Sequence, residues 1–172
     1  MTLNEPAIKL RGHTLLCLQG FRGEGYSAAF VENLGTIHAD LARDPRRLVE
    51  VIDRPDAVCG ACPHHAHSGC SLKGDSFETE MRAQDQVVLT RLGLESGMRL
   101  RWEEILERIR HRVRGSDLVG ICGQCRWLPL GYCAEGIESL RTGSTSSMVS
   151  THEPPEGWIP SSSLKRPPTS KA

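Results

Sequence analysis

The sequence predicts an α+β fold, with a small sheet packed on three to four helices and two cysteine-rich turns beside the first helix. Three observations favour this fold class. Two short segments, 7–11 and 47–53, show the apolar patterning of strands. Longer segments carry an apolar residue at every third or fourth position, as amphipathic helices do. One cysteine spacing occurs twice, over residues 59–70 and 122–133.

Composition limits the domain count and the class of partner. The chain has 172 residues, of which 38% are hydrophobic and 5% aromatic, and this suits one domain with a mostly aliphatic core. A metal or a disulfide would therefore add to a core rather than replace one. Because 21 basic residues balance 21 acidic ones, the chain lacks the broad positive field that attracts phosphate backbones. We do not expect nucleic acid as a partner.

The first elements follow from local patterns. Segment 7–11, AIKLR, alternates apolar and basic side chains, which predicts a short strand with one buried face. Segment 12–20 predicts one or two helical turns. Ser27 is a good N-cap for a helix over 28–43. Its apolar face would consist of Phe30, Leu34, Ile37 and Leu41.

The later elements are a strand and three helices. Segment 47–53, RLVEVID, is rich in β-branched residues and predicts the second strand, which leads directly into the first cysteine cluster. Asp75 and Glu78 form a capping pair that we expect to open the next helix. Apolar periodicity predicts another helix over 102–113, and a short helix is expected over 135–141.

The C-terminal segment differs in composition from the rest of the chain. From Thr142 onward it is dominated by Ser, Thr, Pro and Gly and has no apolar periodicity. Such a segment buries too little apolar surface to offset the entropy lost on ordering. The sequence therefore predicts a cysteine-rich domain over residues 1–141 and a disordered tail over 142–172.

No segment has the pattern of a targeting signal or a membrane span. The N-terminal stretch MTLNEPAIKLRGH contains Glu5 and no apolar run of signal-peptide length, and no stretch approaches about eighteen apolar residues. We therefore expect a cytoplasmic protein that does not bind membranes. Glutathione and thioredoxin keep cytoplasmic thiols reduced, so the seven cysteines indicate metal ligands or redox groups rather than structural disulfides.

Six of the seven cysteines form two matching groups of the form C-G-x-C-x7-C. The first triad is Cys59, Cys62 and Cys70, and the second triad is Cys122, Cys125 and Cys133. A C-x-x-C spacing folds two thiols into one tight turn, where backbone N–H groups can lower the pKa of the sulfur. Glycines follow the first thiol and precede the third in both groups. The repeat predicts two metal-binding turns.

Each triad is one ligand short of the four that tetrahedral zinc or a cubane iron–sulfur cluster takes. Cys17 is the remaining cysteine, and His13 lies four residues before it, so in a helix the two side chains share one face. Cys17 could complete one site and His13 the other. His64, His65 and His67 compete for this role because they lie between the second and third thiols of the first triad.

Other groupings and another chemistry stay open. Cys59, Cys62, Cys122 and Cys125 could form a single ribbon-like zinc site, although this gives no reason for the equal seven-residue gaps. Thiol–disulfide exchange at one C-x-x-C needs no third thiol at a fixed spacing. Thiolates suit both zinc and iron–sulfur clusters. The Cys62-Pro63 pair favours iron–sulfur, since bacterial ferredoxin motifs end in Cys-Pro.

Four stretches together resemble domain-of-unknown-function family 1284, a family of small bacterial and archaeal proteins suspected of binding iron–sulfur. They are LRGHTLLCLQGFRGEGYSAAFVENL, DAVCGACP, LGLESGMRLRWEEILERI and CGQCRWLPLGYCAEGIESL. The resemblance covers residues 7–141 and all seven cysteines. The family usually opens with Arg-Gly-His-His, whereas Thr14 replaces the second histidine here, so His13 and Cys17 remain the candidate ligands in this segment.

The resemblance and the thiol spacing together imply an iron–sulfur protein, with a [4Fe–4S] cluster, that acts in electron transfer or redox sensing. Its expected partner is a redox protein of unknown identity. The alternative is a zinc-binding structural or interaction module without a redox role. The sequence contains no Ser/His/Asp arrangement or paired-carboxylate setting that would indicate a hydrolytic enzyme.

Overall fold

The computed structural model describes residues 5–143, and its core is a three-stranded mixed sheet. Strands β1 (Ile8–Arg11), β2 (Leu48–Ile52) and β5 (Arg99–Arg101) lie in the order β1-β2-β5. β1 runs parallel to β2, and β5 runs antiparallel to it. The register pairs Leu10 with Val51 and Val49 with Leu100, so the apolar side chains of neighbouring strands lie side by side.

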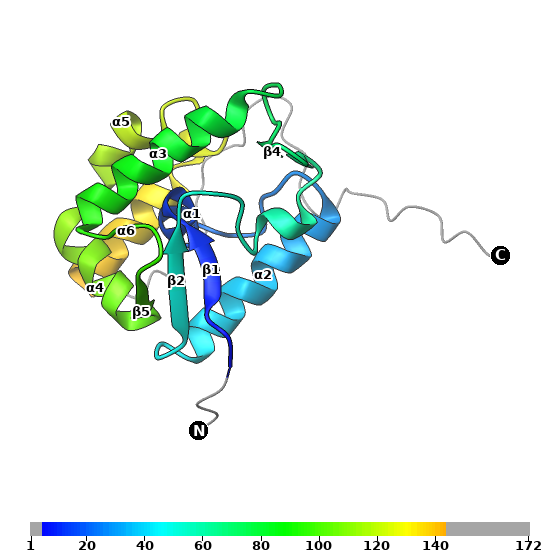
Figure 1. Ribbon diagram of the computed structural model, residues 1–172. Coiled ribbons are helices and arrows are strands. Elements are labelled where there is room, and N and C mark those ends of the chain that lie inside the picture. The colour runs from blue at the N-terminus through cyan, green and yellow to red at the C-terminus, as the bar shows by residue number, and fades with distance from the viewer. Residues whose placement is uncertain (1–4, 144–172) are drawn as a thin grey trace.

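The helices surround this sheet. In Figure 1, α2 lies to the right of the strands, whereas α3, α4 and α6 gather to their left, and α1 lies at the end of β1. The helices are α1 (Gly12–Cys17), α2 (Ala28–Arg43), α3 (Phe77–Leu92), α4 (Trp102–Arg112), α5 (Leu118–Cys122) and α6 (Tyr132–Thr142). A two-stranded hairpin of β3 (His65–Ala66) and β4 (Gly69–Cys70) carries part of the first triad.

The predicted α+β class is confirmed. The small sheet contains both predicted strands and also β5, which was not predicted. The four longer helices correspond to the four predicted periodic segments, and they are α2, α3, α4 and α6. Two further helices, α1 and α5, span only 6 and 5 residues. The predicted tail over 142–172 lies almost entirely outside the described residues.

The core is aliphatic, as composition predicts. Leu15 of α1, Leu41 of α2 and Ile105 of α4 are buried beside the sheet residues Leu10 and Val51. Burial of such side chains contributes about 1.5–3 kcal/mol each, which makes this cluster the main source of stability. The helices on the two sides of the strands are thus held together by buried side chains as well as by the short sheet.

The N-terminus of α2 has the cap that the sequence predicts, and we expect its loss to be measurable. The Ser27 hydroxyl accepts a hydrogen bond from the Phe30 N–H at 3.1 Å. Replacing Ser27 with alanine should lower the free energy of unfolding by about 1 kcal/mol, because one N–H of the first turn loses its acceptor. Urea unfolding measures this change. Ser27→Asp, which keeps an acceptor, should stay close to wild type, and an equal loss in both variants would contradict this role.

The N-terminus of α3 differs from the prediction. The helix begins at Phe77 with Ser76 as its N-cap. The Glu78 carboxylate accepts hydrogen bonds from the Arg11 guanidinium at 2.8 Å and from the Cys70 N–H at 2.7 Å. The predicted capping pair of Asp75 and Glu78 is therefore wrong, because a buried guanidinium competes for the same carboxylate.

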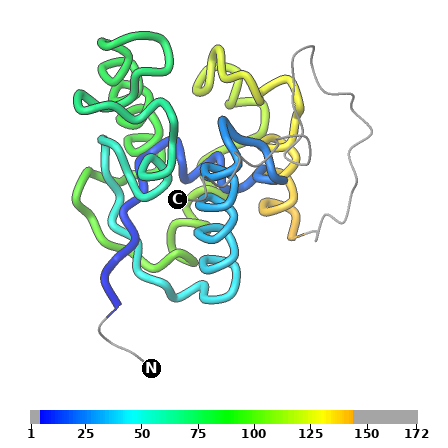
Figure 2. Tube along the Cα trace, turned by 90° about the vertical axis from the view of Figure 1, so that its right-hand side faces the viewer, coloured from blue at the N-terminus to red at the C-terminus, as the bar shows by residue number. Residues whose placement is uncertain are grey.

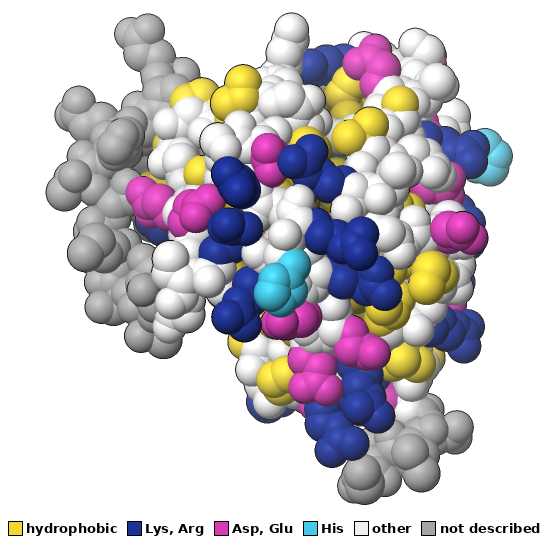
Figure 3. All heavy atoms as spheres, turned by 90° about the vertical axis from the view of Figure 1, so that its left-hand side faces the viewer, with side chains coloured by type: hydrophobic (Ala, Val, Ile, Leu, Met, Phe, Trp, Pro, Cys, Tyr) yellow, Lys and Arg dark blue, Asp and Glu magenta, His cyan; other side chains and the backbone are white. Residues whose placement is uncertain are grey.

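One face of the molecule carries many charged side chains of both signs (Figure 3). Figure 3 shows Lys and Arg side chains gathered on the face formed by the left-hand helices of Figure 1, with acidic side chains between them. Two arginines bind helix ends: Arg108 donates to the carbonyls of Leu92 and Gly93, and Arg141 donates to the carbonyl of Arg110. Among residues 5–143, no helix combines the length and apolar character needed to cross a membrane.

Candidate metal centre

All seven cysteines line a single cavity of about 790 Å³. The cavity lies where α1, α3, the first triad and the second triad meet, and its wall also includes Tyr26 and Trp127. The cysteines that line it are Cys17, Cys59, Cys62, Cys70, Cys122, Cys125 and Cys133. Each is a half-buried free thiol. Thiols from distant parts of the chain therefore line the same cavity.

The first triad is held by a short turn and the β3–β4 hairpin. The Cys62 N–H donates to the Cys59 carbonyl at 3.0 Å, which closes the C-x-x-C turn. Cys70 pairs with His65 across the hairpin. Burial, together with the negative charge of Asp56, raises the pKa of the Cys59 thiol to about 12. Burial also raises the pKa of Cys62.

The second triad lies on α5, on α6 and on the segment between them. Cys122 ends α5, and its carbonyl accepts a hydrogen bond from the Cys125 N–H at 2.9 Å. Cys133 is the second residue of α6. Burial, followed by the neighbouring Cys125, raises the pKa of Cys122 to about 11 and that of Cys133 to about 12. Thiols this basic need a cation to become thiolates at neutral pH.

The repeated glycines have a conformational reason in most positions. Gly69 and Gly131, which precede the third cysteine of each triad, have φ angles of 111° and 74°. Gly123, after the first thiol of the second triad, has a φ of 50°. Residues with a Cβ rarely adopt these angles, so the turns require glycine. The equivalent Gly60 lies in a 3-10 turn instead, so the two C-x-x-C turns differ in backbone conformation.

Cys17 reaches the cavity from α1, and the loop that follows this helix packs against Cys133 of the second triad. Burial raises the pKa of the Cys17 thiol well above its ordinary value, and Cys133, Cys125 and Cys122 raise it further, in that order. The helix end packs closely on α6: a Cβ added to Gly20 would lie 2.7 Å from the Cys133 sulfur.

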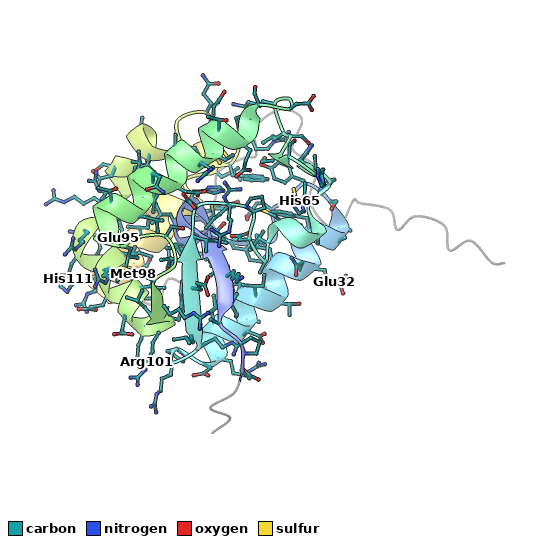
Figure 4. The ribbon with its side chains drawn as sticks, in the orientation of Figure 1. Glu32, His65, Glu95, Met98, Arg101 and His111 are labelled. Carbon is teal, nitrogen blue, oxygen red and sulfur yellow. The ribbon has the colours of Figure 1, made fainter. Side chains whose placement is uncertain are left out.

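His13 is the one histidine among the described residues that lines the cavity. Its Nδ1 lies 2.7 Å from a carboxylate oxygen of Asp85, which also accepts the His13 backbone N–H at 3.0 Å. A carboxylate at Nδ1 fixes the ring and leaves Nε2 for a metal, which is a common arrangement around ligating histidines. The competing candidates lie elsewhere: the His64 ring packs on Tyr26, and His65, labelled in Figure 4, is exposed on the hairpin, as is His67 on its turn.

A buried polar cluster supports the first triad, and sequence reasoning missed it. The Arg11 side chain is 2% exposed and binds Asp85, which is fully buried, at 2.8 Å. Arg11 also binds Glu78, whose carboxylate holds the Cys70 N–H. The Asp56 carboxylate accepts the Arg11 N–H at 2.8 Å and the Cys59 N–H at 3.2 Å. The backbone of two triad residues is thus fixed by carboxylates around one arginine.

One signal for this cluster was present in the sequence. Asp85 precedes Val88, Leu89 and Leu92 at the spacing of one helix face. A carboxylate on the buried face of a helix needs a cationic or N–H partner. The identity of that partner, Arg11, depends on the fold, because the two residues lie on β1 and α3.

Tyr26 is a second residue that sequence reasoning missed. Its ring lies 4.9 Å from the His64 ring and 4.7 Å from the Trp127 ring, measured between centroids. His64 belongs to the loop of the first triad and Trp127 to that of the second. Burial raises the pKa of the Tyr26 hydroxyl far above its ordinary value, and thiols of both triads raise it further. Tyr26 therefore contacts the loops of both triads.

The thiols line the wall of the cavity without converging on one point. Among residues 5–143, no group of three or more His, Cys, Asp or Glu side chains is arranged so that it could hold a single metal ion. Thiolates around one zinc ion lie about 3.8 Å apart, given Zn–S bonds of about 2.3 Å in a tetrahedron. A [4Fe–4S] cluster binds each thiolate to a different iron, so its ligands lie further apart.

Comparison with known proteins gives one match. A protein family described as "Protein of unknown function (DUF1284)" matches residues 25–131. Neither the curated proteins nor the solved structures contain a match to the chain. The matched range is narrower than the resemblance over 7–141: it includes the first triad with Cys122 and Cys125, whereas Cys17 and Cys133 lie outside it. Because the match covers more than half of the chain, the protein belongs to domain-of-unknown-function family 1284.

Proposed function

We propose that the protein binds iron–sulfur, as [4Fe–4S], and acts in electron transfer or redox sensing. The observation that carries this proposal is the convergence of all seven cysteines on one cavity. The donor set fits the group, since thiolates are the usual protein ligands of these clusters. When bound, a cluster supplies one-electron redox chemistry.

The chain's own residues have separate tasks in this proposal. The seven cysteines hold the metal, and the turns that contain glycine position these cysteines. Tyr26 and Trp127 cover the cavity wall with aromatic rings, which limits the access of water and thereby shifts the reduction potential of the centre. The carboxylates of Asp56 and Glu78 fix the backbone of the first triad.

The cellular setting is part of the same proposal. A compartment that keeps thiols reduced, such as the cytoplasm, suits seven free cysteines. Electron transfer requires a partner, which we propose to be a redox protein. Since the positive and negative charges balance, a nucleic acid is a poor candidate for this role.

Anaerobic purification of the full chain tests the proposal. We expect a brown protein with visible charge-transfer bands and matching amounts of iron and sulfide. Cys62→Ser should lower both, because it removes a thiol from the cavity wall. His67→Ser is the matched control, since this exposed histidine lies in the same loop. A colourless protein that contains zinc would contradict the proposal and favour a structural zinc module.

A further inference from the structure

We propose that the cavity holds two separate centres rather than one. The first is bound by the first triad, and its fourth position is not filled by a cysteine. The second is bound by four thiols, those of Cys17 and the second triad. This inference rests on the iron–sulfur function proposed above, and it adds the number of centres and the ligands of each.

Helix packing assigns Cys17 to the second triad. The loop after α1 packs directly on the first two turns of α6. A Cβ added to Gly20 would collide with the backbone of Cys133, and a Cβ added to Gly136 would collide with the carbonyl of Gln19. Glycine at each of these two positions permits this close approach, so the contact between the two helices is specific. Cys17 and Cys133 are thereby brought to the same part of the cavity wall.

The two groups also rest on different parts of the fold. The first triad is fixed by Asp56 and by Glu78 at the start of α3. The second triad lies on α5 and α6, and the Gln84 amide of α3 binds the Ile121 carbonyl beside it at 3.1 Å. In Figure 2 the teal-to-green segment that contains the first triad lies at the upper left, and the yellow segment with the second triad lies at the upper right.

Tyr26 contacts the loops of both triads. Its ring packs on His64 of the first loop and on Trp127 of the second. In the two-centre arrangement, this aromatic contact joins the loops of two neighbouring centres.

Variants that remove thiols singly and in pairs test the grouping. The full chain is purified anaerobically, and iron and sulfide are counted per chain. Cys17→Ser and Cys133→Ser should each remove about half of the metal, and the double variant should remove no more than either one. Cys70→Ser should remove the other half. The Cys17→Ser/Cys70→Ser variant should retain almost none.

A second set of variants controls for loss of metal that is caused by misfolding. Cys125→Ser and Cys59→Ser should repeat the pattern of Cys133→Ser and Cys70→Ser, and circular dichroism checks that each variant keeps its helices. In reduced samples, Cys17→Ser and Cys70→Ser should each retain a different electron paramagnetic resonance signal, because the two donor sets differ.

The outcomes separate this inference from the proposed function. Complete loss of iron in folded Cys17→Ser or Cys70→Ser would overturn the two-centre arrangement while leaving an iron–sulfur protein. Equal metal content in Cys70→Ser and Cys17→Ser/Cys70→Ser would overturn the assignment of Cys17. If the protein contains zinc in place of iron, and the variants lose this zinc in the same two halves, the iron–sulfur function is overturned. The grouping of the thiols then still stands.

Discussion

Replacement of Arg11 with methionine should lower the free energy of unfolding by about 3–5 kcal/mol. Arg11 donates to Asp85 and Glu78, each at 2.8 Å. Asp85 is fully buried, and the Glu78 side chain is 13% exposed. Methionine fills a similar volume but carries no charge, so both carboxylates would remain in a poorly solvated site without their cation. The measurement is urea unfolding of the anaerobic protein.

Two further variants identify the cause of this loss. Arg11→Lys keeps the charge but not the planar fork, so it should lose less stability than Arg11→Met. Arg11→Met combined with Glu78→Gln and Asp85→Asn removes the unpaired charges and should recover much of the stability. A loss below about 1 kcal/mol in Arg11→Met would contradict the role of Arg11 as the charge partner of the cluster.

Replacement of Gly136 with alanine should separate α1 from α6 and empty the proposed four-thiol centre. The added methyl group would collide with the Gln19 carbonyl, which is backbone and has little freedom to move. Overpacking of this kind costs about 1–3 kcal/mol, and here the strain would be relieved by moving Cys17 away from Cys133. Urea unfolding and iron analysis of the same samples measure both effects.

The control for Gly136→Ala lies on the neighbouring helix. Gly120 of α5 has open space around its Cα, so Gly120→Ala should be neutral or should stabilise the protein by about 0.4–1 kcal/mol. The first triad lies away from this contact, so about half of the iron should remain in Gly136→Ala. Full iron content in a folded Gly136→Ala protein would contradict the link between helix packing and Cys17.

The elements with strong local patterns could be predicted from the sequence. Helix α2 spans Ala28–Arg43 as expected, because the Ser27 cap and the apolar repeat agree. Strand β5 was missed because it has only three residues, of which Leu100 is the apolar one, and its pairing with β2 links distant segments. The last helix begins at Tyr132 rather than 135, since Gly131 ends the preceding turn and permits an earlier start.

The cysteines of the candidate site could be picked out from the sequence. The repeated C-G-x-C-x7-C spacing singles out six of the seven thiols that line the cavity, although the two C-x-x-C turns differ in backbone conformation. The partner of Cys17 was not predictable, since it depends on how α1 packs against α6. Likewise, the roles of Tyr26 and Arg11 arise from contacts between segments that no local pattern connects.

The positions of the ligands along the chain imply an order of assembly during synthesis. The first triad lies within residues 59–70, so its thiols leave the ribosome together and early. The packing of Gly20 against Cys133 joins the segment of the first helix to the last described one, so it must wait until α6 has emerged. Closing such a long loop is entropically costly and slow. Metal binding at the proposed second centre would then be the final step, and it would stabilise the newly folded domain.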